Sequence, residues 1–223
     1  MARIALRDRL LPSYTNGEEI FNMVTHIVGG GLGIAFLVLC IIKSVIRGSM
    51  SGVFCSVIYG TSVILLYCCS SIYHGLKPPL AKKVFQVLDH CAIYVLIAGT
   101  YTPVLALSIW NISVFWAIFM LVVVWGLTAL AITFTAIDLK AYRVFSFICY
   151  IFIGWCVVFI IKPTLKALPI EGFILLLAGG ILYTIGSILY GIGSRKKFMH
   201  SIFHIFVLLG SIAHFLCIIF YVL

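Results

Sequence analysis

Apolar residues are arranged along this chain in long runs of about 20 residues, separated by short polar gaps. An α-helix of that length spans the hydrocarbon core of a bilayer. The runs predict seven helices, near residues 20–46, 52–76, 84–107, 112–135, 143–162, 170–192 and 199–222. We therefore expect an all-α integral membrane protein, folded as a bundle of seven transmembrane helices.

Helix-breaking residues occupy the gaps between the runs. Prolines follow lysines at Lys77-Pro78 and Lys162-Pro163, and a proline lacks the N–H group that would continue the helical hydrogen bonds. The gaps are too short to hold a separate soluble domain. We expect one membrane domain covering residues 1–223, in which residues 1–19 form a short segment ahead of the first helix.

The composition supports a membrane protein and argues against other classes. Hydrophobic residues make up 64% of the 223 residues and charged residues only 9%, which is too little polar surface to cover a soluble protein of this size. The net charge of +9 comes from fifteen Lys and Arg residues that are scattered over the gaps, so we expect no nucleic acid partner. Eight cysteines form no CxxC pair, which argues against a disulfide framework or a cysteine zinc site.

The distribution of Lys and Arg predicts the orientation of the bundle, because cytoplasmic loops retain these residues. Eleven fall on one side, namely Arg3, Arg7, Arg9, Lys77, Lys82, Lys83, Lys140, Arg143, Arg195, Lys196 and Lys197. Four fall on the other side, namely Lys43, Arg47, Lys162 and Lys166. We expect the N-terminus in the cytoplasm, the C-terminus outside, and the protein in the cell membrane.

Polar and ionisable residues gather at four helix ends, all on the predicted cytoplasmic side. They are Glu19, Asn22 and His26; Ser70, Ser71 and His74; Asp89 and His90; and His200 and His204. Such residues are costly within a membrane, and their presence there indicates function. Four segments that are distant in sequence are therefore expected to build one polar layer.

The spacing of the histidines in this layer is typical of a metal site. His200 and His204 are four residues apart, so both side chains lie on one face of a helix and can bind the same ion. With His74 they supply three neutral nitrogen ligands, the set that leaves zinc a fourth position for water. Asp89 lies inside an apolar run, where its carboxylate could accept a proton from that water.

Other interpretations of these residues stay open at this stage. Asp89 could instead pair with Lys82 or Lys83 at the membrane interface. His214 lies about 20 Å deeper than His200 along the last helix, too far for the same ion, and is read as a buried polar contact. His26 and His90 are weaker candidates for the surroundings of the metal. The glycines at 29–31 and 33 are read as a site of close helix packing.

Four motifs carry a family resemblance. They are Glu19-Ile-Phe-Asn22-Met-Val-Thr25-His26; Ser70-xxx-His74; Leu88-Asp89-His90 followed by Ala98-Gly-Thr-Tyr-Thr-Pro103; and His200-xxx-His204 with His214. Together they resemble the bacterial hemolysin III family, within the superfamily of adiponectin and progestin receptors. The resemblance implies a seven-helix bundle with its N-terminus inside and zinc ligands at His74, His200 and His204. It also implies that Asp89 and Ser70 stand around the zinc-bound water.

Three functions are compatible with this pattern. The first is a zinc-dependent hydrolase within the membrane that cleaves a lipid amide such as ceramide, with the acyl chain held among the helices. The second is a membrane-state sensor or receptor-like protein in which zinc ties helices together without turnover. The third is a pore or cytolysin, as the family name implies, but no predicted helix carries a repeated polar stripe that could line a channel.

Overall fold

The computed structural model describes residues 5–193 and 196–223, apart from the side chains of residues 192 and 193. Its α-helices are α1 (Asn16–Ile46), α2 (Met50–Gly75), α3 (Pro79–Pro103), α4 (Val114–Ile137), α5 (Arg143–Gly154), α6 (Ile161–Ala167), α7 (Ile170–Gly193) and α8 (Met199–Cys217). Over the described residues there are seven spans long and apolar enough to cross a membrane, which confirms the predicted count. Helices α5 and α6 make one of these spans together, joined by the short helix η4 (Cys156–Ile160).

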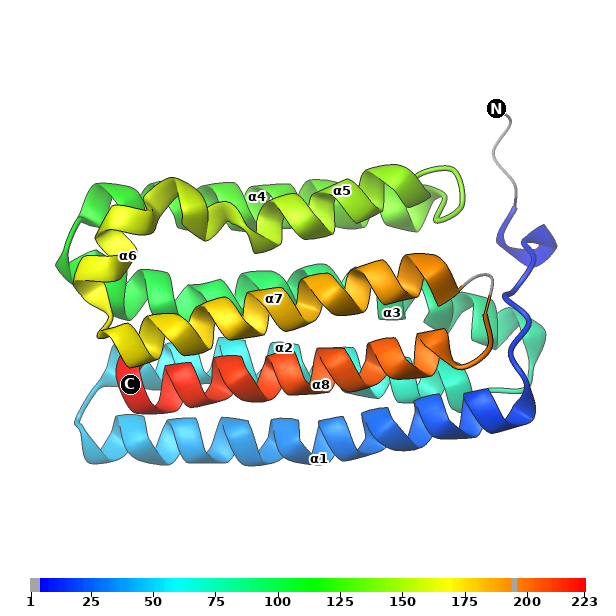
Figure 1. The fold of residues 1–223 in the computed structure, drawn as a ribbon, viewed down its shortest axis with the longest axis horizontal. Helices are drawn as coiled ribbons and strands as arrows, with labels where there is room; N and C mark the ends of the chain where they lie inside the picture. Colours follow the sequence, from blue (N-terminus) through cyan, green and yellow to red (C-terminus); the bar gives the residue numbers. More distant parts are fainter. Residues whose placement is uncertain (1–4, 194–195) are drawn as a thin grey trace.

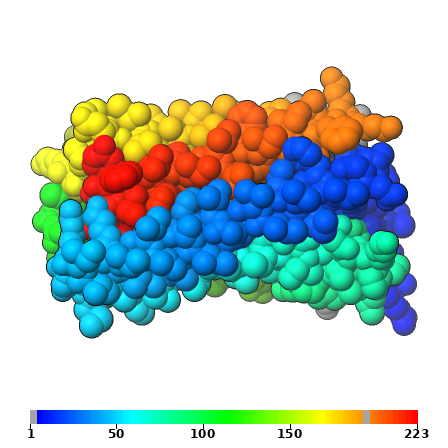
Figure 2. All heavy atoms as spheres, turned by 90° about the horizontal axis from the view of Figure 1, so that it is seen from below, coloured from blue at the N-terminus to red at the C-terminus, as the bar shows by residue number. Residues whose placement is uncertain are grey.

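The helices lie side by side along one common direction, and residues 5–15 and the C-terminus lie at opposite ends of the bundle (Figures 1 and 2). Helix α1 packs against α2 and α8, α7 packs against α8, and α3 lies between α2 and α4. We call the end where α1 and α8 begin and α2 ends the site end. The N-terminal segment lies at this end, whereas the C-terminus lies at the far end.

Three helices begin earlier than the apolar runs predicted, because their first turns are set by capping residues rather than by hydrophobicity. Helix α1 begins at Asn16, where Thr15 and Glu18 form a reciprocal capping box. Helix α2 begins at Met50, after the Ser49 hydroxyl accepts a hydrogen bond from the Gly52 N–H. Helix α3 begins with Pro79, a residue suited to the first turn. The expected starts at 20, 52 and 84 were therefore too late.

The glycines of α1 allow a close approach to α2, as expected for a packing motif. A Cβ atom placed on Gly29 would lie 2.4 Å from the ring of Tyr67, and one placed on Gly33 would lie 3.0 Å from Val63. Only residues without side chains permit this separation of the two backbones.

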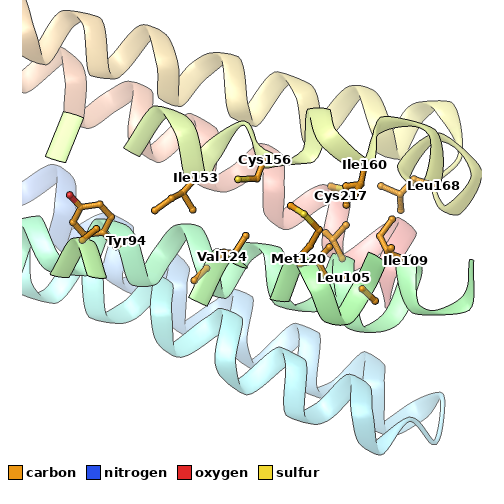
Figure 3. Packing of buried hydrophobic residues seen from close by; sticks show 14 residues of the cluster. Tyr94, Leu105, Ile109, Met120, Val124, Ile153, Cys156, Ile160, Leu168 and Cys217 are labelled. Atoms are coloured by element: carbon orange, nitrogen blue, oxygen red, sulfur yellow. The ribbon is translucent and has the colours of Figure 1, made fainter. Parts of the chain in front are cut away.

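An apolar cluster extends along the bundle from Tyr94 to the far end (Figure 3). Its members include Leu105, Ile109, Met120, Ile160, Leu168 and Cys217. These side chains come from segments that are distant in the sequence, and each is at most 4% exposed. In the described part of the chain all eight cysteines are free thiols, so packing rather than disulfides holds this end together.

The orientation of the bundle is a prediction that a reporter can test. If the bias of Lys and Arg decides insertion, the site end faces the cytoplasm and the C-terminus faces outward. A reporter that is active only in the cytoplasm should then stay silent when fused after Leu223 and be active when fused before the first residue. Activity of the C-terminal fusion alone would mean that the bundle is inserted the other way round.

Candidate metal centre

Three histidines from two helices converge at the site end. His74 lies in the last turn of α2, and His200 and His204 lie in the first two turns of α8. The Nε2 atom of His200 is 3.3 Å from that of His74 and 3.0 Å from that of His204. All three side chains are buried, and one nitrogen from each lies within 4.8 Å of the others. The structure thus brings together the three predicted ligands.

The tautomer of His74 leaves a lone pair directed at this cluster. Its Nδ1 lies 2.6 Å from the Glu19 carboxylate, which can only accept, so Nδ1 carries the proton and Nε2 is bare. Nitrogens bound to one tetrahedral zinc ion at about 2.1 Å would lie about 3.4 Å apart, close to the spacing found here. The three ring nitrogens that converge here carry too few protons to form hydrogen bonds with one another. Their lone pairs can instead bind a metal ion, so the group fits a metal site.

Glu19 is a site residue whose role the spacing of the histidines did not indicate. Its second carboxylate oxygen pairs with Lys82 Nζ at 2.8 Å, so the carboxylate is held from two sides. Histidines that bind metals usually donate their other N–H to a carboxylate or carbonyl group. Glu19 lies in the first turn of α1, at the same end of the bundle as the histidines. The rule that a ligating histidine needs such a partner could therefore have identified Glu19 from the sequence.

We predict that Glu19→Gln weakens metal binding by roughly 10- to 100-fold, the usual effect of losing the partner of a ligating histidine. The amide keeps the size of the side chain but removes the charge that fixes the His74 tautomer. Competition with a zinc chelator on purified protein measures the change. Glu171→Gln is the matched control, since Glu171 is exposed at the start of α7 at the far end. Equal affinities in the two variants would contradict the role of Glu19.

Aromatic rings enclose the histidine cluster. The ring of Tyr14 stacks on His200 with centroids 4.9 Å apart and an interplanar angle of 27°. The ring of His26 stacks on His204 at 3.7 Å and 16°. Burial raises the pKa of Tyr14 above its usual range, so the phenol stays neutral. His26 is therefore in contact with the cluster, in agreement with its place among the weaker candidates.

Asp89 and Ser70 face each other at the same end. Asp89 is buried in α3, and Ser70 lies one turn before His74 on α2 with its hydroxyl directed toward the Asp89 carboxylate, although without a hydrogen bond of normal geometry. In the described residues no ion pair joins Asp89 to either interfacial lysine: Lys82 pairs with Glu19, and Lys83 donates to the Arg7 carbonyl. The alternative that Asp89 neutralises Lys82 or Lys83 was therefore wrong.

The remaining histidines lie outside the cluster. His90 donates from Nδ1 to the Gln86 carbonyl and accepts from the Tyr190 hydroxyl at Nε2, and its Nδ1 also lies 3.9 Å from the Asp89 carboxylate. His214 donates from Nε2 to the Leu176 carbonyl and ties α8 to α7. This is the buried polar contact that its depth predicted.

A cavity of about 1390 Å³ joins this site to the apolar interior. Asp89, Ser70, His200 and His204 line it near the site end, and apolar side chains of α3, α5 and α7 line it further on. It reaches Phe173 and His214, which lie toward the far end. Small-molecule pockets typically have volumes of about 300–1,000 Å³, so this one is large enough for a longer apolar chain.

Comparison with known proteins gives consistent results along almost the whole chain. The family model described as Haemolysin-III related matches residues 14–215, a range that includes every residue of the candidate centre. Hemolysin-3 of Bacillus cereus is 41% identical over 206 residues, which cover 92% of this chain and 92% of that protein. The Hemolysin-3 homolog of Bacillus subtilis (strain 168) is 40% identical over 208 residues, covering 93% and 96%.

Proposed function

This chain belongs to the haemolysin-III-related family of multi-pass membrane proteins, and from that premise we propose that it is a zinc-dependent hydrolase of a lipid amide such as ceramide. The observation that carries the proposal is the continuity between the cavity and the histidine cluster. An acyl chain in the apolar part of the cavity would place the amide at its head beside Asp89 and the three histidines.

One set of residues would bind the metal, and another would move a proton. His74, His200 and His204 would hold the zinc ion, with Glu19 keeping the Nε2 atom of His74 free. When bound there, zinc supplies polarisation of a carbonyl and lowers the pKa of a coordinated water. The donor set of three neutral nitrogens is the one that keeps a position open for such chemistry.

Asp89 would act as the general base. In amide hydrolysis a water oxygen adds to the carbonyl carbon, the C–N bond breaks, and the nitrogen leaves as an amine with an added proton. Asp89 would take the proton from water and return it to the leaving nitrogen. Ser70, which faces the carboxylate, would orient it by hydrogen bonding. Both residues line the cavity, so both are accessible to a substrate held there.

A sensor or receptor-like protein without turnover is the second candidate. The observation that favours it is that the three ligands and Glu19 come from α1, α2 and α8, so a bound ion would tie three helices together. A pore has less support, because buried apolar side chains such as Leu105 and Ile109, rather than a polar stripe, occupy the far end of the bundle in the described residues.

Lipid profiling of the reconstituted protein tests the proposal. We expect amide lipids to be converted to fatty acid and amine by the zinc-loaded protein and to persist after treatment with a chelator. Metal binding without turnover of any amide lipid would contradict the hydrolase and favour the sensor. Ion flux through the liposomes would favour the pore.

A further inference from the structure

Of the two ligands on α8, His200 lacks the hydrogen-bonded support that His74 has. Its Nδ1 atom is buried and has no hydrogen-bond partner among the described residues, whereas the His204 ring faces the backbone carbonyl of Asn22, although without a hydrogen bond of normal geometry. A ligating histidine is normally held by such a partner on its second nitrogen. Something other than a hydrogen bond must therefore keep the His200 ring turned toward the cluster.

Ring stacking on His200 takes the place of this missing hydrogen bond. Tyr14 lies nearly parallel to the His200 ring, with centroids 4.9 Å apart, and its ring is 5.8 Å from that of His74. Tyr190 and Phe203 contact His200 as well, but both are tilted and lie at 5.5 Å. The residue that stacks on His200 is therefore Tyr14, which lies outside the membrane spans.

Contacts made by the residues before and after Tyr14 hold it in place. Thr15, its neighbour, is the N-cap of α1 and is locked there by the capping box with Glu18. Glu18 also accepts a hydrogen bond from the Phe198 N–H at 2.7 Å, which joins the start of α1 to the turn before α8. The residue that positions Tyr14 is thus connected directly to the helix that carries His200.

The other contacts that hold this segment are made by residues that precede Tyr14. Arg9 donates to the Ile137 carbonyl at 2.7 Å and lies 4.0 Å from the Asp138 carboxylate, with both side chains largely buried. Lys83 donates to the Arg7 carbonyl at 2.5 Å. The segment from Leu6 to Thr15 therefore crosses the site end from α1 toward α3 and the end of α4 (Figure 1). Its residues 8–15 form part of the cavity wall.

We propose that Tyr14 is a positioning residue for the metal centre, stacking on His200 to hold its ring, and that Arg9 secures Tyr14 there. This inference rests on the proposed metal site but not on hydrolysis. Residues 8–15 also form the wall of the cavity beside the ligands. How firmly this segment is held against the bundle therefore controls how fast an ion leaves toward the site end.

Metal binding by Tyr14 variants tests the proposal. Aromatic pairs contribute enough that Tyr14→Ala should weaken zinc binding roughly three- to ten-fold and speed its loss to a chelator. Tyr14→Phe keeps the stacked ring and should behave as the wild type, which a purely hydroxyl-based role would not allow. With cobalt in place of zinc, the visible spectrum should change in Tyr14→Ala and be unchanged in Tyr14→Phe.

The role of Arg9 is tested against its neighbour in the same segment. Arg9→Ala should speed metal loss in the same direction as Tyr14→Ala, whereas Arg7→Ala should not, because the Arg7 side chain is 83% exposed. Hydrogen exchange of residues 5–15 should rise in Arg9→Ala even after the metal is removed, and this measurement does not depend on metal binding or turnover. Equal metal affinity and exchange in wild type, Tyr14→Ala and Arg9→Ala would overturn the proposal.

Discussion

Replacing His200 and His204 together with alanine is expected to remove the metal from the purified protein, which we predict to carry about one zinc ion per chain. The double variant retains His74 alone, and a single imidazole is too few ligands for a zinc site of the catalytic type, which uses three protein ligands. Elemental analysis of the purified protein measures the metal content. Mild acid should have the same effect on the wild type, because the ligands must be neutral and protonation of the imidazoles competes with the metal.

The control for this variant is His214→Ala. His214 lies on the same helix and is equally buried, but it donates to the Leu176 carbonyl and stands outside the cluster. It should lose stability through the broken contact with α7 and keep its metal. Full metal content in the double variant at 200 and 204 would exclude the assigned ligands.

Asp89→Asn is expected to keep the metal and to lower lipid amide hydrolysis on the order of 10²- to 10⁴-fold, the range that general-base catalysis contributes. Asparagine has almost the same shape and stays polar, so the packing of α3 should survive. It cannot accept the proton that Asp89 would take. Metal content, thermal stability and turnover should be measured on the same preparation, with Glu171→Gln at the far end of the bundle as the control.

The alternatives for Asp89 give different results in this experiment. If the carboxylate served only the fold, turnover per folded molecule would stay at the wild-type level while stability fell. If it bound the metal directly, the metal content would fall with the activity. Retained metal together with lost turnover is the combination that only the general-base role predicts.

The membrane spans follow from the sequence alone. Their lengths are set by the thickness of the bilayer, and every span needs enough apolar residues to exclude water, so a local property of the chain determines them. The pairing of His200 with His204 is equally local, because the pitch of a helix places residues four apart on one face. The limits of α1, α2 and α3 were predicted less well, since Thr15, Ser49 and Pro79 act through capping rather than hydrophobicity.

The completion of the site was decided by the tertiary structure. His74 on α2 meets His200 and His204 on α8, and nothing near His74 in the sequence encodes this meeting. The pairing of Glu19 with His74 and Lys82 joins residues 55 and 63 positions apart, and it separates Lys82 from Asp89. Tyr14 reaches His200 across 186 positions. Contacts of this kind depend on the rotation and spacing of packed helices, which hydrophobic periodicity does not specify.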